Sequence, residues 1–166
     1  LGTYSDRSAE IQSKWQTMYD GIQRVNSYLR VIPTMDVLTE EQKNEYMAEA
    51  RFLRGMFYFT LLDLYGGVPY YDEKTNLNVE YVGLKKPRSS AEEIRAHIIS
   101  DLNEAVAYLP VRHNDSDYGR ATKGAAYALR GKVYLYNKEW QNAIADFEEI
   151  VNNKSNNYGY GLDADY

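Results

Sequence analysis

The 166-residue chain contains no cysteine and only two histidines. The absence of cysteine excludes a disulfide framework and any chemistry that needs a thiol. A formal net charge of -5 argues against a nucleic-acid-binding surface, which usually carries a basic patch. No run reaches the roughly 18 to 20 continuous apolar residues that a membrane-spanning helix needs. A chain of this length can nevertheless bury a core as one domain.

Support for catalysis or cofactor binding is also lacking. His97 falls in a helical stretch and His113 in a polar loop, and no nucleophile arrangement accompanies either of them. The glycine pair at 66–67 is followed by Val and Pro rather than by a helix, so it is not a phosphate-binding loop. The acidic stretch 114–117 lacks the spacing of a calcium loop and predicts turn and capping interactions. We therefore expect a protein that is not an enzyme, with no metal site and no cofactor.

Tyrosine is the residue in excess: there are 17, against four Phe and two Trp. Tyrosine combines a flat apolar face with a polar tip, which suits both helix packing and solvated binding surfaces. Trp15 and Trp140 lie on apolar helical stripes, so we expect both in the core.

Five segments repeat apolar residues at steps of three and four, the pattern of amphipathic helices. The pairs Thr39/Gln42 and Ser90/Glu93 have the spacing of a capping box, which predicts that a helix begins at each. Residues 66–90 show no helical period, so they form a long irregular loop. The predicted helices cover 8–32, 39–65, 90–109, 122–136 and 140–151.

Two predictions concern which side chains are buried. Charged residues such as Arg54 and Asp101 are expected on solvated helix faces, the usual place for a charge. The inner face of the second helix is predicted to contain Tyr46, Ala50, Leu53, Phe57, Leu61 and Leu64.

Part of the second helix recurs 76 residues later in the fourth helix. Such self-similarity is typical of stacked helix pairs. In the last predicted pair, Gly131, Ala143 and Phe147 fit the tetratricopeptide (TPR) spacing; an ordinary helical hairpin is the alternative interpretation. The recurring residues are Ala50, Leu53, Arg54, Gly55 and Tyr58, repeated as Ala126, Leu129, Arg130, Gly131 and Tyr134.

Five segments taken in order resemble the SusD/RagB family, surface lipoproteins of Bacteroidetes-type bacteria. They are Trp15-x3-Tyr19-x2-Ile22-x3-Asn26, Glu49–Gly55, Leu64–Pro69, Arg120–Ala126 and Gly131–Tyr136. The resemblance implies an all-α fold of TPR-like stacked helix pairs with a long irregular loop. It also implies that residues 1–166 are the helical, TPR-containing region of a larger SusD-like fold. The first residue is Leu1, so we expect a mature or truncated piece of a longer protein.

The same resemblance implies a role at the cell surface. Family members capture glycans, or in some branches peptides, and deliver them to a SusC-like TonB-dependent transporter of the outer membrane without a reaction of their own. A lipid-modified cysteine, which this chain lacks, anchors them to that membrane. A TPR-type adaptor that binds a peptide or protein partner is the alternative function.

Sugar binding needs flat aromatic faces together with amides and carboxylates. The aromatic residues expected outside the helical core supply the candidate ligand-binding residues, although each could instead pack over a helix end. These candidates are Tyr4, Tyr70, Tyr71, Tyr81 and Tyr118.

Overall fold

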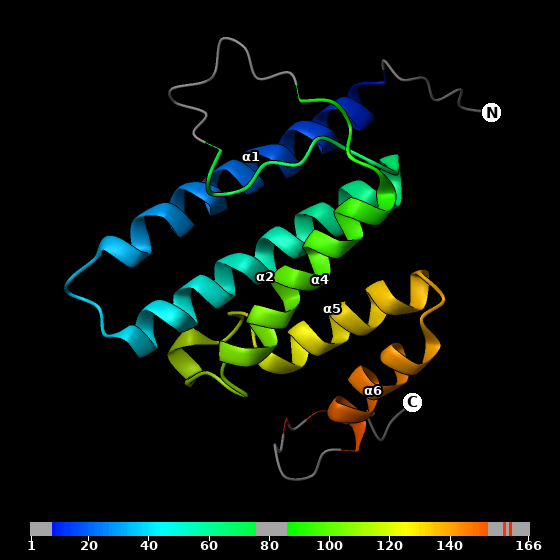
Figure 1. Ribbon diagram of the computed structural model, residues 1–166. Helices are drawn as coiled ribbons and strands as arrows, with labels where there is room; N and C mark the ends of the chain where they lie inside the picture. Colours follow the sequence, from blue (N-terminus) through cyan, green and yellow to red (C-terminus); the bar gives the residue numbers. More distant parts are fainter. Residues whose placement is uncertain (1–7, 76–85, 153–157, 159, 161–166) are drawn as a thin grey trace.

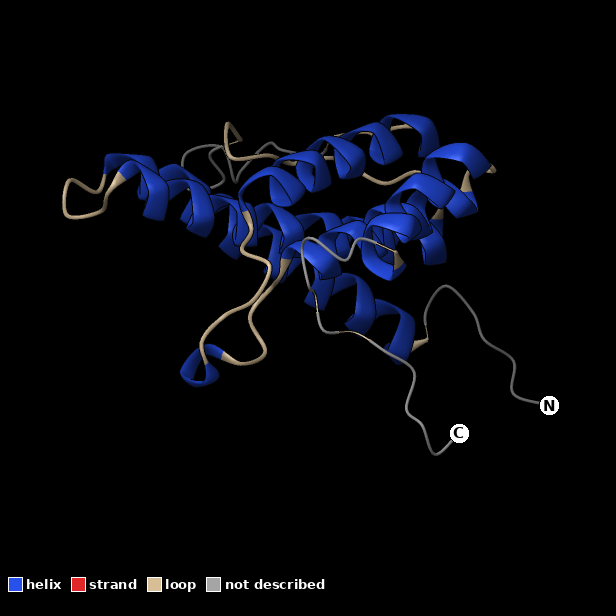
Figure 2. Cartoon of the chain, turned by 90° about the horizontal axis from the view of Figure 1, so that it is seen from below, coloured by secondary structure: helices blue, strands red, loops and turns tan. Residues whose placement is uncertain are grey.

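The computed structural model describes residues 8–75, 86–152, 158 and 160, and these form helices and loops without a strand (Figures 1 and 2). The predicted all-α class and the five predicted helices are therefore confirmed. None of the helices in these ranges has the length and apolarity needed to cross a membrane. The α-helices are α1 (Ala9–Val31), α2 (Glu40–Tyr65), α4 (Ala91–Tyr108), α5 (Lys123–Tyr136) and α6 (Trp140–Val151), with short 3-10 helices η1 (Ile32–Thr34) and η2 (Asp115–Asp117).

Both predicted capping boxes form. Thr39 Oγ1 accepts a hydrogen bond from the Gln42 amide at 3.2 Å, and Gln42 Oε1 accepts one from the Thr39 amide at 2.9 Å. Ser90 and Glu93 repeat this exchange at 3.1 and 2.7 Å. Each box pairs amide groups that the first helical turn leaves without an intrahelical partner, which is why α2 and α4 begin where they do.

The helices follow one another in space in their order along the chain (Figure 1). α1 packs on α2, α2 on α4, α4 on α5 and α5 on α6. The largest fully buried side chains lie where α1, α2 and α4 meet, at Ile22, Tyr58, Leu61, Ile98 and Leu102. The core is therefore centred on α2 and α4.

The predicted inner face of α2 is only partly correct. Ala50 and Leu61 are buried, but Leu53 is 38% exposed and Leu64 is 56% exposed. α2 lies between α1 and α4, so two sides of the helix are covered and its buried arc is wider than a single stripe. That arc also includes Ala48, Arg54, Gly55, Tyr58 and Phe59.

The apolar stripe predicts Trp140 in the core, but this prediction is wrong. Its side chain is 53% exposed, and Ile144 and Val151 on the same helix are exposed as well. α6 packs on α5 alone within the described part of the chain, so its other side has no cover there. Trp15, by contrast, is partly buried and packs against the main core cluster.

Arg54 and Asp101 are also buried rather than solvated, with exposed fractions of 2% and 3%. Arg54 Nε and Nη2 donate to the two oxygens of Asp101, both at 2.7 Å, and Nη1 donates to Asn26 Oδ1 at 2.7 Å and Glu73 Oε2 at 2.5 Å. Burial opposes the charge of Arg54, but hydrogen bonding to Asp101 outweighs it and raises the pKa of Arg54. The prediction was wrong because four acceptors in good hydrogen-bond geometry offset the cost of removing the Arg54 charge from water.

The internal repeat is a repeat of helix pairing. Arg130 of α5 binds Asp146 of α6 through two hydrogen bonds of 2.8 and 2.6 Å, as Arg54 of α2 binds Asp101 of α4. Gly131, the next residue, lies against the Phe147 ring: an added Cβ would come within 2.7 Å of it. The small residue and the paired arginine thus hold the two helices of a hairpin close together.

The described part of the long loop is anchored to α1 and α2. The Tyr19 hydroxyl donates to the Pro69 carbonyl at 2.8 Å, and Asn26 Nδ2 donates to the Tyr71 carbonyl at 3.0 Å. The Tyr58 hydroxyl donates to the Tyr71 carbonyl at 3.0 Å and accepts from its amide at 2.7 Å. These bonds fix residues 66–75 against the helices and so shape the surface beside them.

Candidate functional site

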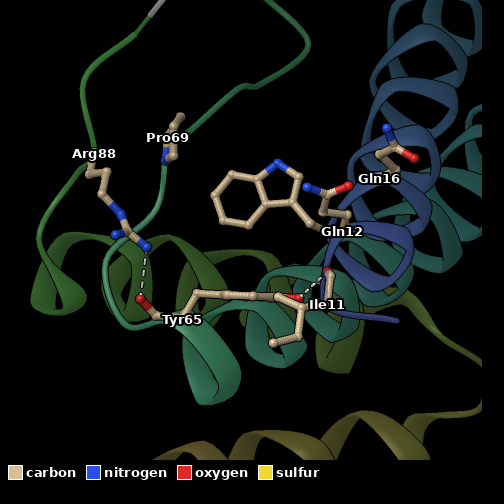
Figure 3. A pocket seen from close by; sticks show the side chains of 7 residues that line it. Ile11, Gln12, Gln16, Tyr65, Pro69 and Arg88 are labelled. Atoms are coloured by element: carbon tan, nitrogen blue, oxygen red, sulfur yellow. Dashed lines mark hydrogen bonds between the residues drawn. The ribbon is translucent and has the colours of Figure 1, made fainter. Parts of the chain in front are cut away.

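An open groove lies where the beginning of α1 meets the end of α2 and the two described arms of the long loop, residues 66–75 and 86–90 (Figure 3). Its volume is about 790 Å³. In Figure 3, Gln12 and Gln16 project from α1 on one side, and Pro69 and Arg88 lie opposite on the loop. The lining residues are Ile11, Gln12, Trp15, Gln16, Tyr65, Pro69 and Arg88.

Two aromatic rings give the groove a rigid apolar wall. Trp15 and Tyr65 meet edge to face, with ring centroids 5.1 Å apart and planes at 84°. Trp15 also contacts Tyr19 at 4.9 Å, and the Tyr65 hydroxyl donates to the Ile11 carbonyl at 2.8 Å. Because the rings are held by contacts from α1 and α2, little side-chain entropy is lost when a ligand stacks on them.

Amide side chains provide the polar part of the groove. Within the described residues, the side-chain amides of Gln12 and Gln16 have no hydrogen-bond partner, so each can both donate and accept toward the opening. Arg88 has a different role: its Nε donates to the Gly67 carbonyl at 2.6 Å and its Nη2 to the Tyr65 carbonyl at 2.9 Å. Arg88 thereby caps the carboxyl end of α2 and fixes the loop arm that forms the far wall.

A fixed aromatic wall beside free amides matches a carbohydrate. The apolar face of a sugar ring can stack on an aromatic face, while its hydroxyl groups need donors and acceptors at the rim.

Within the described residues, one group, Glu45, Glu49 and His113, has the number and spacing of oxygen and nitrogen atoms for a metal ion. Arg120 already donates to both oxygens of Glu49, at 2.9 Å each, which makes that group an ion-pair cluster.

The structure places the predicted tyrosines in different surroundings. Tyr70 is half-buried and stacks on His97, with centroids 3.7 Å apart, and burial raises the pKa of its hydroxyl. Tyr71 is half-buried at the loop base, in edge contact with Tyr19. Tyr118 is 94% exposed and far along the chain from both. Tyr4 and Tyr81 lie outside the described residues. None of the five lines the groove within the described part of the chain, so their role as ligands stays a prediction.

The groove residues themselves were missed from the sequence. The apolar stripe predicts Trp15 in the core, and the sequence marks Tyr65 only as the end of the second helix. The one available signal is that Tyr65 directly precedes the Gly66–Gly67 break, a position where an aromatic ring lies at a helix end. The meeting of Trp15 with Tyr65 depends on how α1 packs on α2, which no local pattern contains.

Residues 3–135 match a family model described as "Starch-binding associating with outer membrane". The chain belongs to the SusD-like family. One curated relative, from Bacteroides thetaiotaomicron, is named a starch-binding protein, and one structural neighbour is described as a laminarin-binding SusD-like protein. The family predicted from the sequence is therefore confirmed.

Relatives support this assignment over most of the chain. SusD-like protein P25 of Formosa agariphila is 28% identical over 161 residues, which are 91% of this chain and 30% of the relative. A laminarin-binding SusD-like protein has a similar structure, with a TM-score of 0.81, 33% identity and coverage of 90% of this chain and 32% of that chain. A structure solved with a xylogluco-oligosaccharide gives a TM-score of 0.77 and 26% identity, and the match covers 92% of this chain and 30% of that chain. The chain thus spans about a third of the length of these SusD-like relatives.

Proposed function

We propose that this SusD-like chain forms part of a surface protein that captures an oligosaccharide and passes it on unchanged. The observation that carries the proposal is the groove of Figure 3, where a fixed aromatic wall faces two free amide side chains. The structural neighbours that bind laminarin or a xylogluco-oligosaccharide support the same class of ligand.

In this proposal a sugar ring lies against the Trp15 and Tyr65 wall. The amides of Gln12 and Gln16 donate to and accept from its hydroxyl groups, and Arg88 keeps the opposite wall in place. Among the described residues that line the groove, none is arranged as a nucleophile with a base, and we propose that the ligand leaves with its glycosidic bonds intact. The glycan is held by stacking and neutral hydrogen bonds, which favours reversible binding.

The destination of the ligand is part of the proposal. We place the intact protein at the outer membrane, held by a lipid anchor outside this chain, and beside a SusC-like TonB-dependent transporter that receives the glycan. The family description, which names association with the outer membrane, supports this location. The helices from α1 to α6 would serve as a TPR-like scaffold that holds the groove in position.

Trp15→Ala is expected to weaken glycan binding by roughly tenfold or more, because it removes the larger of the two stacking surfaces. The measurement is retardation of the intact protein in native gels that contain starch, laminarin or xyloglucan. The matched control is Trp140→Ala, which removes the other tryptophan from an exposed site on α6 and should leave retardation unchanged.

The recovered glycan should keep its chain length after prolonged incubation with the protein. Equal retardation of the Trp15→Ala variant and the native protein would rule out this groove as the site. Shortened glycan would rule out passive capture.

A further inference from the structure

A second hollow lies at the other end of α2. Its volume is about 470 Å³, and the loop that contains η2, the start of α5 and two tyrosines from the end of the chain surround it. Arg120, one of its lining residues, pairs with Glu49 of α2. Glu49 precedes Tyr65 of the first groove by sixteen residues, or about 24 Å of helix at 1.5 Å per residue. The two hollows are therefore separate.

Three tyrosine rings give this hollow its apolar surface. Tyr158 and Tyr160 lie parallel, with planes at 3° and centroids 6.0 Å apart. Tyr158 is buried, whereas Tyr160 is 57% exposed and Tyr118, on the opposite loop, is 94% exposed. Two of the rings that line the hollow, Tyr118 and Tyr160, are thus exposed, and the Tyr160 ring is backed by the buried Tyr158 ring, so both can offer a flat face to a ligand.

The position of these rings is built into the start of α5. A Cβ at Gly124 would come within 2.6 Å of the Tyr160 ring and 3.1 Å of the Tyr158 ring, so both rings rest on a site that only glycine leaves open. The Tyr160 hydroxyl also lies 3.1 Å from Thr122 Oγ1, in hydrogen-bond contact. Thr122 is the N-cap of α5, which ties the ring to the helix end.

Two charged side chains in the hollow are available to a ligand. Within the described residues, neither Arg112 nor Asp115 has a side-chain hydrogen bond or ion pair. The other charged groups are already engaged: Arg120 donates to Glu49 at 2.9 Å, and His113 Nε2 lies 2.7 Å from the Ala121 carbonyl. A free planar donor and a free acceptor beside stacking rings fit neighbouring hydroxyl groups of a sugar.

We propose that this hollow is a second saccharide subsite, in which a sugar ring stacks between Tyr118 and Tyr160 while Arg112 donates to its hydroxyl groups and Asp115 accepts from them. The inference rests on the proposed function, because it assigns a second contact to the same captured glycan. Two separate subsites favour long glycan chains over short ones, because a long chain bound at one subsite can reach the other without a second encounter in solution.

The test compares binding of a polysaccharide with binding of a short oligosaccharide from it, for the intact protein and its variants. The probes are starch, laminarin and xyloglucan, each in polymeric and short form. Tyr118→Ala and Arg112→Ala each remove an exposed group and should weaken polymer binding roughly three- to tenfold. The control Tyr136→Ala removes a tyrosine that is 58% exposed at the far end of α5 and should change nothing.

The outcomes separate this inference from the proposed function. If Tyr118→Ala and Arg112→Ala bind the polysaccharide as tightly as the native protein while Trp15→Ala binds it more weakly, the second subsite is overturned. The first groove then remains supported. If Tyr118→Ala and Arg112→Ala bind the polysaccharide more weakly while Trp15→Ala binds it normally, the second subsite is supported and the first groove is overturned. If no variant and no native protein binds any of the three polysaccharides, both proposals are overturned.

Discussion

Replacing Arg54 with alanine is expected to lower the free energy of unfolding by about 3–5 kcal/mol, the usual cost of breaking a buried ion pair by removing one partner. Arg54 is 2% exposed and supplies the donors for Asn26, Glu73 and Asp101. Without it, Asp101 is a buried carboxylate that has lost both of its short hydrogen bonds. The measurement is equilibrium denaturation by urea.

The chain contains a matched control for this change. Arg130 holds the equivalent place in the repeat and pairs with Asp146, but its side chain is 16% exposed, against 3% for Arg54. Arg130→Ala is therefore expected to cost about half as much, because the Arg130 side chain is the more exposed of the two arginines and its remaining hydrogen bond goes to Asn103 at the surface. Equal losses in the two variants, or a loss below about 1 kcal/mol for Arg54→Ala, would contradict the role given to the buried network.

Gly67→Ala is expected to cost about 3 kcal/mol, the upper end of the range for overpacking. A Cβ at Gly67 would overlap the backbone carbonyl oxygen of Ser89. The Ser89 backbone cannot easily move away, because its amide donates to the Val68 carbonyl at 3.0 Å and this bond holds the two loop arms together. The same denaturation experiment measures the loss, and reduced glycan retention should accompany it because both arms line the groove.

Gly21→Ala separates backbone crowding from side-chain crowding. A Cβ at Gly21 would come within 2.6 Å of the Phe57 ring, and a ring can turn away where a backbone carbonyl cannot. Alanine also favours the helix over glycine by about 1 kcal/mol, so the net loss should be roughly 1 kcal/mol. If Gly21→Ala lowers the free energy of unfolding more than Gly67→Ala does, the close approach of the loop arms at Gly67 is not the tighter constraint on stability.

The elements of the fold could be predicted because their signals are local. Thr39 and Gln42, or Ser90 and Glu93, lie three residues apart and form the same box in any helix that begins there. The failures concern residues whose surroundings come from distant segments. Arg54 is buried only because Asp101 is placed against it from a helix 47 residues further on. Trp140 is exposed because the described part of the chain covers one side of α6 alone.

The sequence predicts aromatic ligand residues, but it does not indicate the residues of the candidate groove. The excess of tyrosine directs attention to exposed tyrosines, whereas Tyr70 uses a face of its ring to stack on His97. The groove instead combines Trp15 with Tyr65, which meet because the Tyr65 hydroxyl reaches the Ile11 carbonyl across 54 positions of sequence. Such a meeting follows from the packing of α1 on α2, which a single sequence does not specify.

A crystal structure of the intact protein with an oligosaccharide from the glycan it retains tests the central claim most directly. We expect a sugar ring stacked on Trp15 in the groove between α1 and the loop, hydrogen-bonded to Gln12 or Gln16, with every glycosidic bond intact. An empty groove with the oligosaccharide bound elsewhere, or a cleaved ligand, would contradict the account.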